Sequence, residues 1–243
     1  MVKPRSRVTR TPPRSASRPE EGLPPIVVGV SGASGAAYGL ELIARLLDAG
    51  REVHAIVTDP ARTVIAMETG LVLPAQPQAI GRKLDQYFAR SITRHGRLRV
   101  FGNQQWSAPM ASGSARIDAM AICPCSMGTL SAVATGASHT LLERAADVMI
   151  KERGRLVMVP RETPLSTIHL AHMLHLAQAG VVILPASPGF YQPPVTVERL
   201  VSFIVARTLD HLGVAQDFMP SWGSRAQTWG GSRVYTANRS RKR

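Results

Sequence analysis

Residues 26–50, IVVGVSGASGAAYGLELIARLLDAG, decide the fold. Five apolar residues, Ile26–Val30, precede a short loop of glycine and serine, and an amphipathic stretch follows from Gly35 to Ala49. A short apolar run bounded by a turn is typical of a buried strand, whereas apolar residues spaced three and four apart indicate a helix. The stretch therefore predicts a strand, a tight loop and a helix, which together form the first unit of an α/β domain.

The same alternation continues along the chain. We expect further strands at 53–57, 119–123, 156–159 and 181–184, and further helices at 61–69, 128–135, 141–153, 164–178 and 195–212. Strands that are apolar throughout and separated by helices indicate a parallel sheet covered on both faces. The predicted fold class is α/β: a doubly wound, Rossmann-like (flavodoxin-like) three-layer sandwich with a mostly parallel sheet. Residues 70–118 break the rhythm with one polar helix and a loop at 106–114, and long ordered insertions usually carry function.

The composition indicates one folded domain between two basic tails. The chain has 243 residues and is 44% hydrophobic, which suits a single large core. Of the net charge of +13, residues 1–24 carry +4 and the C-terminal tail, residues 223–243, carries +6. The remainder has an ordinary surface charge, so a nucleic-acid partner is unlikely on this pattern. We expect tail 1–24, rich in Pro, Arg and Ser, to be disordered, and residues 25–222 to form the domain.

The chain shows no membrane signal. No apolar run approaches the roughly 20 residues that cross a bilayer. We therefore expect a cytoplasmic protein without a membrane partner. The Arg- and Ser-rich, acid-poor start also resembles a transit peptide, which leaves an organellar matrix as the minor alternative.

Three predicted loops at one edge of the sheet offer glycines and hydroxyl groups to a ligand. Open α/β sheets bind ligands beyond the carboxyl ends of their strands, where loops lead into helix N-termini. The loops are 31–35 (SGASG), 124–129 (PCSMGT) and 159–164 (VPRETP). The second could hold a phosphate or the polar edge of a flavin, although each could equally be a turn with a helix cap. None is the GxGxxG fingerprint, so a nicotinamide dinucleotide is disfavoured.

Several charged side chains stand in apolar settings. They are Glu68, Arg144, Lys151, Arg161, Glu162 and Arg207. Individually such residues are usually solvated, and Arg161 and Glu162 could form a local ion pair. Arg144 and Lys151 lie seven residues apart on a predicted helix and therefore share a face. Together the four cations would suit an anionic group. Tyr191, after the last strand, could close over a ligand or simply fill the core.

A metal site is disfavoured. His169, His172 and His175 recur every three residues and spread over about 120° of helix surface. No Cys, Asp or Glu accompanies them at ligand spacing, and the only two cysteines, Cys123 and Cys125, have no partner ligands for zinc.

Four segments resemble the signatures of the UbiX-type flavin prenyltransferases, within the wider class of homo-oligomeric flavin-containing cysteine decarboxylase folds. The segments are GVSGASGAAYG (29–39), MAICPCSMGTLSAVATG (120–136), LLERAADVMIKERGRLVMVPRETPLSTIHL (141–170) and ILPASPGFY (183–191). The likeness runs from about Ile26 to Trp222 and leaves out both tails. It identifies residues 25–222 as a flavoprotein domain.

The resemblance implies a role for each matching position. FMN would be held by Gly32, Ala33, Ser34, Thr58, Ser126, Met127, Gly128, Thr129 and Arg161. Thr58 stands where the family usually has serine. Dimethylallyl phosphate would meet Trp106, Ser112, Arg144, Lys151, Tyr191 and Arg207. The implied catalytic residues are Glu68, Glu162, Lys151 and Ser34.

The resemblance also implies the reaction and the partners. Reduced FMN would be a substrate that receives a dimethylallyl group at N5 and C6, without a metal, and prenylated FMN would pass to a UbiD-type decarboxylase, often in ubiquinone biosynthesis. Family members are homo-oligomers, commonly dodecamers, with the flavin site between subunits. The alternatives are an FMN-dependent peptidyl-cysteine decarboxylase, which would not need Lys151, Glu162, Tyr191 and Arg207, and a non-catalytic flavin-binding subunit.

Overall fold

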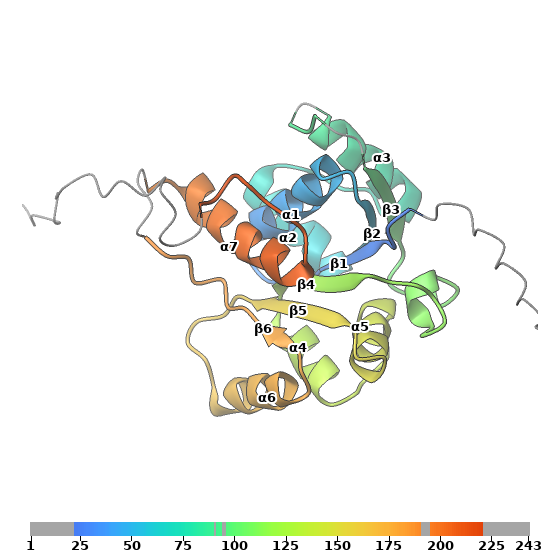
Figure 1. Cartoon of the computed structure of the whole chain (residues 1–243), viewed down its shortest axis with the longest axis vertical. Coiled ribbons are helices and arrows are strands. Elements are labelled where there is room, and N and C mark those ends of the chain that lie inside the picture. The colour runs from blue at the N-terminus through green and yellow to red at the C-terminus, as the bar shows by residue number, and fades with distance from the viewer. Residues whose placement is uncertain (1–21, 90, 94–95, 191–194, 221–243) are drawn as a thin grey trace, which may run out of the picture.

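The computed structural model describes residues 22–89, 91–93, 96–190 and 195–220. Six strands form one sheet and helices cover both of its faces (Figure 1). In chain order the elements are β1 (Ile26–Val30), α1 (Ala36–Asp48), β2 (Glu52–Val57), α2 (Asp59–Thr69), α3 (Pro77–Phe88), β3 (Arg97–Phe101), the short helix η1 (Pro109–Ala111), β4 (Ala119–Cys125), α4 (Met127–Ala134), α5 (Leu141–Lys151), β5 (Arg155–Pro160), α6 (Thr167–Gln178), β6 (Val182–Ile183) and α7 (Val197–Leu212).

The two predicted tails fall almost wholly outside the described residues. Their boundaries at 24 and 223 therefore stay predictions. Within the described ranges, every helix is too short or too polar to cross a membrane.

The sheet is parallel throughout and has the strand order β3-β2-β1-β4-β5-β6. The chain winds outward in one direction from β1 to β3 and then, after returning to β4, in the other direction. This confirms the doubly wound, Rossmann-like fold. In such sheets the crevice between the two strands where the winding reverses, here β1 and β4, is the preferred place for a ligand.

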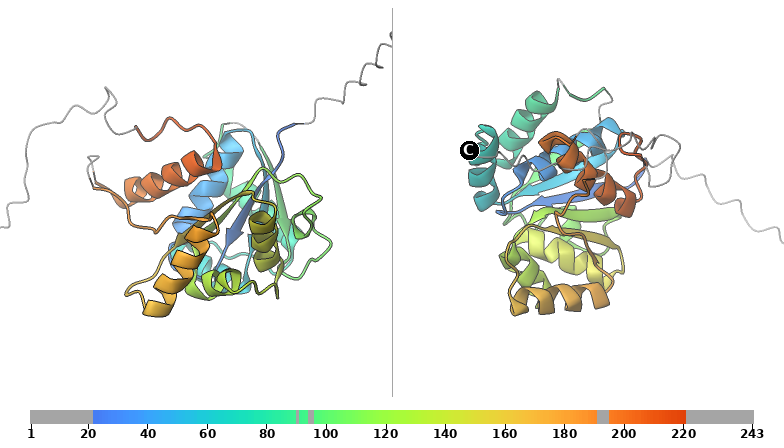
Figure 2. Two further views of the ribbon diagram at one scale, coloured as in Figure 1. Left: turned by 60° about the horizontal axis from the view of Figure 1, so that its bottom comes forward. Right: turned by 90° about the vertical axis from the view of Figure 1, so that its left-hand side faces the viewer.

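Each face of the sheet has its own apolar core. One core lies under α1, α2, α3 and α7, and the other lies under α4, α5, α6 and the segment around η1 (Figures 1 and 2). β1 and β4 are buried along their whole length, because helices cover both of their sides. The central strands are therefore fixed by packing on two faces.

Most predicted elements are confirmed, with shifted ends. β3 was missed, because Arg97 and Arg99 alternate with Leu98 and Val100 on an edge strand that has one exposed face. The expected helix start at Pro164 was also wrong: α6 begins at Thr167, where the Ser166 side chain caps the first turn. The place of β3 at the edge of the sheet explains why its pattern is partly polar, and the cap by Ser166 explains why α6 begins later than expected.

Both cysteines are buried thiols, and they lie in different cores. Regular strand alternation would place Cys123 and Cys125 on the same face. The pairing of β4 with β5 is irregular between Ile122 and Cys125, and this turns Cys125 to the opposite face. Burial raises the pKa of both thiols. Both cysteines are therefore core residues.

An ion-pair network fixes the edge of the sheet where the strands begin. Asp118, just before β4, accepts from Arg51 at 2.6 Å and from Arg155 at 3.1 Å. Arg51 also donates to the Pro24 carbonyl, and Arg155 donates to the Leu212 carbonyl at the end of α7. One carboxylate thus joins the starts of β2, β4 and β5.

We predict that Asp118→Asn lowers the free energy of unfolding by about 2 to 4 kcal/mol, because the mostly buried Arg51 loses its counter-charge. The control is Asp59→Asn. Asp59 pairs with Arg62 at 2.7 Å but is 89% exposed, so its loss should cost less than about 1 kcal/mol. Urea denaturation of both variants measures the difference, and equal losses would contradict the prediction.

Candidate functional site

The loops that follow β1, β2, β4 and β5 gather at one edge of the sheet, around the crevice between β1 and β4. Parallel strands bring their carboxyl ends together at this edge. The structure therefore places residues 31–35, Thr58, 126–129 and 161–163 side by side in the way the sequence predicts.

Direct hydrogen bonds join three of these loops. The Ser126 amide donates to the Ser31 hydroxyl at 2.7 Å. The Arg161 amide donates to the Cys125 carbonyl at 3.3 Å, and the Arg161 Nε donates to the Ser34 carbonyl at 3.1 Å. Each loop is thus tied to the other two.

The first loop ends at a helix start that Glu68 occupies. The Glu68 carboxylate accepts from the Gly35 amide at 3.0 Å and from the Ala36 amide at 2.7 Å. The N-cap residue is Gly35, whose φ of 106° is in the left-handed region, and no side chain of the loop caps α1. The start of α1 is therefore satisfied by a carboxylate from the end of α2 and not by a hydroxyl of the loop.

The surroundings of Glu68 hold its side chain in the ionised form. Partial burial alone would raise its pKa, but hydrogen bonds from the Ser34 hydroxyl and from the Ala36 and Gly35 amides, with the charge of Arg161, bring the pKa below its ordinary value. At neutral pH Glu68 is therefore a carboxylate that can accept a proton.

The second loop leaves its helix start open to a ligand. Ser126 is the N-cap of α4, and its Oγ accepts from the Thr129 amide at 3.3 Å and lies 3.1 Å from the Thr129 Oγ. The first-turn amides of Met127 and Gly128 have no acceptor within the helix. No atom lies within 4 Å of the place where a Cβ on Gly128 would stand. Free amides, hydroxyl groups and open space fit a phosphate or the polar edge of FMN.

Two further residues shape the β1 and β2 side of the crevice. Thr58 caps α2, because its hydroxyl accepts from the Ala61 amide at 3.2 Å, which leaves its proton and one lone pair for a ligand. A Cβ on Gly32 would lie 2.5 Å from the Pro60 Cβ, so glycine alone allows this approach of the two loops. Ala33, which follows Gly32 in the first loop, is buried.

The third loop carries Arg161 and Glu162 without joining them. The Glu162 carboxylate accepts from the neighbouring Thr163 amide at 3.1 Å, whereas Arg161 turns toward Ser34. The local ion pair considered from the sequence is therefore not formed. A cavity of about 410 Å³ opens here, lined by Pro160, Arg161, Glu162, Thr163, Leu165, Met173, Pro185, Ala186 and Ser187.

Four residues implied for the isoprenoid donor lie elsewhere, around α5. Arg144 donates to the Ala111 carbonyl at 3.0 Å and to Asp147 at 2.7 Å. Lys151 pairs with Glu152, and both side chains lie against Gly113, where a Cβ would be 2.0 Å from the Glu152 carboxylate. Ser112 hydrogen-bonds Ser114 at 2.9 Å. Trp106, earlier in the same segment, is 47% exposed.

The other two residues implied for binding the isoprenoid donor, Arg207 and Tyr191, are not seen beside these four. Arg207 lies on α7, on the opposite face of the sheet from α5, and pairs with Asp210 at 2.7 Å. Tyr191 lies outside the described residues. His169 takes part in the capping box of α6 with Ser166, and no group of three metal-ligating side chains occurs where the chain is described.

One subunit therefore does not bring all the predicted site residues together. Lys151 ends α5, which leads into the start of β5, whereas Arg161 follows the end of β5. The six residues of β5 span about 15 to 20 Å, and one phosphate group cannot bridge that distance. Among the described residues, no hydrogen bond or ion pair links Lys151, Arg144 or Arg207 to the loops at the crevice.

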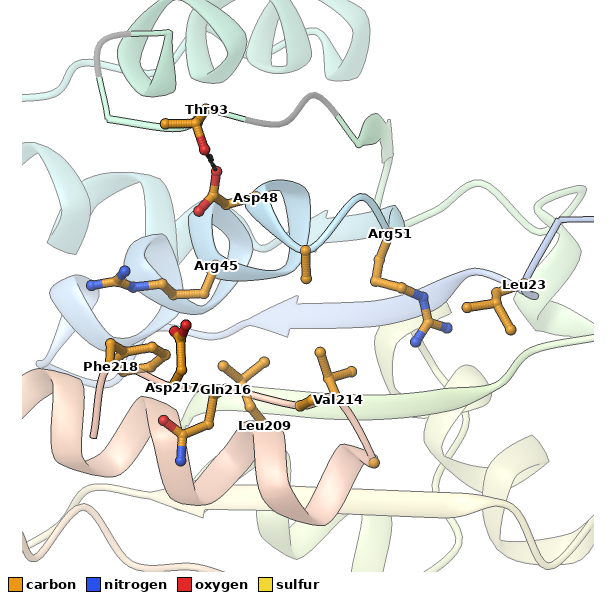
Figure 3. A pocket seen from close by; sticks show the side chains of 13 residues that line it. Leu23, Arg45, Asp48, Arg51, Thr93, Leu209, Val214, Gln216, Asp217 and Phe218 are labelled. Atoms are coloured by element: carbon orange, nitrogen blue, oxygen red, sulfur yellow. Dashed lines mark hydrogen bonds between the residues drawn. The ribbon is translucent and has the colours of Figure 1, made fainter. Parts of the chain in front are cut away.

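A further cavity, of about 580 Å³, lies between the end of α1 and residues 213–218 (Figure 3). Arg45, Asp48, Arg51 and Asp217 are among its lining residues. Arg51 belongs to the edge where the strands begin, and the cavity has no helix N-terminus. None of the predicted site residues lines it, so it is not the candidate flavin site.

Ser31 is a site residue that the sequence interpretation passed over. Its hydroxyl comes directly after the five buried residues of β1. A polar side chain at the buried end of a central strand needs a partner, and that requirement was the available signal.

Comparison with known proteins gives one consistent picture. The Flavoprotein family matches residues 13–209. The chain is 54% identical over 198 residues to the flavin prenyltransferase UbiX of Pseudomonas aeruginosa, covering 82% of this chain and 93% of that protein.

Two solved structures share the fold closely. The complex of AnUbiX with FMN and dimethylallyl pyrophosphate superposes with a TM-score of 0.69 at 36% identity and covers 82% of this chain and 99% of that one. A dodecameric FMN-dependent UbiX-like decarboxylase from Escherichia coli O157:H7 also has a TM-score of 0.69 at 36% identity, with 82% and 98% of the two chains covered.

We predict that Glu68→Gln lowers the melting temperature at pH 7 and that the difference from the wild type disappears in acid. The folded-state pKa of Glu68 lies below the ordinary 4.5. Its stabilisation is therefore complete above about pH 4.5 and is lost as the pH falls through the lower, folded-state value. Thermal unfolding between pH 7 and 3.5 measures it, with Asp217→Asn as the control for loss of one negative charge. A difference that does not change with pH would contradict the prediction.

Proposed function

The chain belongs to the UbiX-type flavin prenyltransferases of the Flavoprotein family, and we propose that its active site is assembled from more than one subunit. Its activity is to attach a dimethylallyl group to FMN, which makes prenylated FMN. The observation that carries this conclusion is the crevice at the β1/β4 reversal. There, Ser34, Glu68 and Arg161 meet beside the open start of α4 in a chain 54% identical to such an enzyme.

When bound, reduced FMN would supply the nucleophile: N5 would bond to the allylic carbon as its C–O bond to phosphate breaks, and C6 would bond to the prenyl chain as the alkene gains a proton and C6 loses one. The chain's own residues orient it. The open amides of Met127 and Gly128 and the hydroxyls of Ser126 and Thr129 offer donors on one side of the crevice. Within the described residues Arg161 uses only its Nε, so its terminal nitrogens are available to FMN.

Glu68 and Ser34 are the proposed pair for proton transfer on the flavin side. Glu68 is ionised at neutral pH and receives the Ser34 hydroxyl hydrogen bond. Because Glu68 is ionised at neutral pH, it carries no proton to donate and can only accept one. We therefore assign Glu68 the role of base in ring closure, with Ser34 as the hydroxyl that relays the proton.

The remaining predicted residues suit the departure of phosphate. Loss of phosphate builds negative charge, which Arg144, Lys151 and Arg207 can offset. Trp106 and Tyr191 suit a dry, aromatic wall around an allylic group with cationic character. Glu162, exposed at the mouth of the third loop, is the proposed source of a proton for the leaving phosphate.

Neighbouring subunits would bring the two sets of residues together. Within one chain Lys151 and Arg161 lie at opposite edges of the sheet. Arg144 and Lys151 are already held against the 111–114 segment as a unit that a second copy could present to the crevice. Contact between copies is therefore part of the proposed catalytic mechanism.

The surface of α6 supports assembly of this kind. Ile168, Leu170 and Leu174 are 64%, 52% and 60% exposed. A helix that is apolar on nearly all sides is normally buried, so another copy is expected to cover α6. We propose a homo-oligomer, and the dodecameric relative makes twelve subunits the favoured number.

Prenylated FMN has value only for another enzyme, and we propose a UbiD-type decarboxylase as its acceptor. We place the protein in the cytoplasm, because reduced flavin persists best in a reducing compartment. We also propose that residues 25–222 form the complete flavoprotein domain.

The first test is anaerobic incubation of the protein with FMN, a reductant and dimethylallyl phosphate, followed by mass spectrometry of the released flavin. We expect the mass of one C5 unit to be added. Diphosphate donor and oxidised FMN serve as parallel samples. Unmodified flavin from a folded, FMN-loaded protein with either donor would refute the function and favour a cysteine decarboxylase.

The second test asks whether one site uses two subunits. We predict that Glu68→Gln and Lys151→Ala are each inactive alone but regain activity when their subunits are mixed, dissociated and reassembled. Random pairing leaves about a quarter of the sites with both wild-type residues, so about a quarter of wild-type activity is expected.

The matched control is a mixture of Glu68→Gln with Ser34→Ala. Both of these changes lie in the same crevice of one subunit, so no pairing restores an intact site. Recovery in the control, or its absence in the test mixture despite full reassembly, would show that one subunit holds the whole site.

A further inference from the structure

Ser31 joins the two strands that border the crevice. It follows the last residue of β1, and its side chain is only 2% exposed. Its hydroxyl donates to the Pro124 carbonyl at 2.9 Å and accepts from the Ser126 amide at 2.7 Å. One buried oxygen thus makes both of its bonds to a loop more than ninety residues away in the chain.

The hydroxyl acts where the sheet itself stops holding the two strands together. The pairing of β1 with β4 runs to Gly29 opposite Ile122. Beyond this point Pro124 has no amide proton to donate, and β4 is irregular between Ile122 and Cys125. Main-chain contact is reduced to the Ser31 amide on the Pro124 carbonyl at 3.2 Å. The hydrogen bonds of the Ser31 side chain therefore extend the connection between β1 and β4 as far as Ser126.

The position of Ser126 governs what the second loop offers. Ser126 caps α4, and the open amides of Met127 and Gly128 follow it directly. Because the Ser126 amide is hydrogen-bonded to the Ser31 hydroxyl, the position of the first turn of α4 is tied to the end of β1. Ser31 itself is too buried to touch a ligand.

We propose that Ser31 is a positioning residue for FMN: its hydroxyl sets the first turn of α4 relative to the β1 loop and thereby determines flavin affinity. The ligand's identity rests on the function proposed above. A buried amide left without a partner would draw α4 away from its place or admit water, and either change separates donors that must bind one flavin together.

The test compares Ser31→Thr with Ser31→Val. The two variants have side chains of nearly the same shape and differ in one hydroxyl, so any crowding by the added methyl group is common to both. The dissociation constant for FMN is measured by fluorescence titration. The KM for dimethylallyl phosphate at saturating FMN and the melting temperature without FMN are measured on the same preparations.

We expect Ser31→Val to bind FMN about tenfold or more weakly than Ser31→Thr. The KM for dimethylallyl phosphate should be the same in both. Equal FMN affinity in the two variants would overturn the proposal. So would a lower melting temperature of Ser31→Val with unchanged FMN affinity, because that result describes a purely structural hydrogen bond.

If the added methyl group prevents folding, Ser31→Ala decides the question, because it removes the oxygen and adds nothing. Wild-type FMN affinity in Ser31→Ala would overturn the proposal, and about tenfold weaker binding would support it. FMN binding is read without turnover. A wild-type protein that binds FMN but does not prenylate it would refute the proposed function while leaving the role of Ser31 to this comparison.

Discussion

The reversal of winding between β1 and β4 is the constraint on which the site depends. Neighbouring strands there send their following helices to opposite faces of the sheet, so α1 and α4 begin close together and then diverge. Two helix starts thus share one crevice, and both would favour a negative charge. Ser31, Arg161 and the glycine at 32 hold the loops at that separation. The chemistry of the site follows from how the two starts are then used.

The chain uses the two starts in different ways. Glu68 comes from the end of α2 and satisfies the amides at the start of α1, so that start already has its anion. The start of α4 is capped by Ser126 but keeps open amides and open space beside Gly128. The amides at the start of α4 are therefore available to a ligand anion, whereas those at the start of α1 already bind the ionised carboxylate of Glu68. In the mechanism that we propose, this asymmetry orients the flavin in the crevice and places the carboxylate of Glu68 beside it.

The sequence alone predicted those elements that a short run of neighbouring residues determines. The apolar runs of β1, β4 and β5 and the loops after them were recognisable, because burial on both faces leaves an unbroken pattern. The edge strand β3 was not, since Arg97 and Arg99 face solvent. The contact of Glu68 with α1 joins residues more than thirty positions apart and depends on how α2 packs, which no local pattern records. The family resemblance implied a catalytic role for Glu68, and the structure shows which amides its carboxylate binds.

The sequence also could not show that Lys151 and Arg161 stand at opposite edges of the sheet. The sequence gives their order along the chain, and both flank β5 within the segment 141–170. The length of β5 separates them, because its six residues hold the two ends of the strand about 15 to 20 Å apart in one subunit. In the proposed homo-oligomer, contact between copies would remove that separation, and burial of the exposed apolar residues of α6 would favour such contact. In the oligomer that we propose, assembly and catalysis are one requirement, because other copies of the chain both cover α6 and bring cations to the crevice.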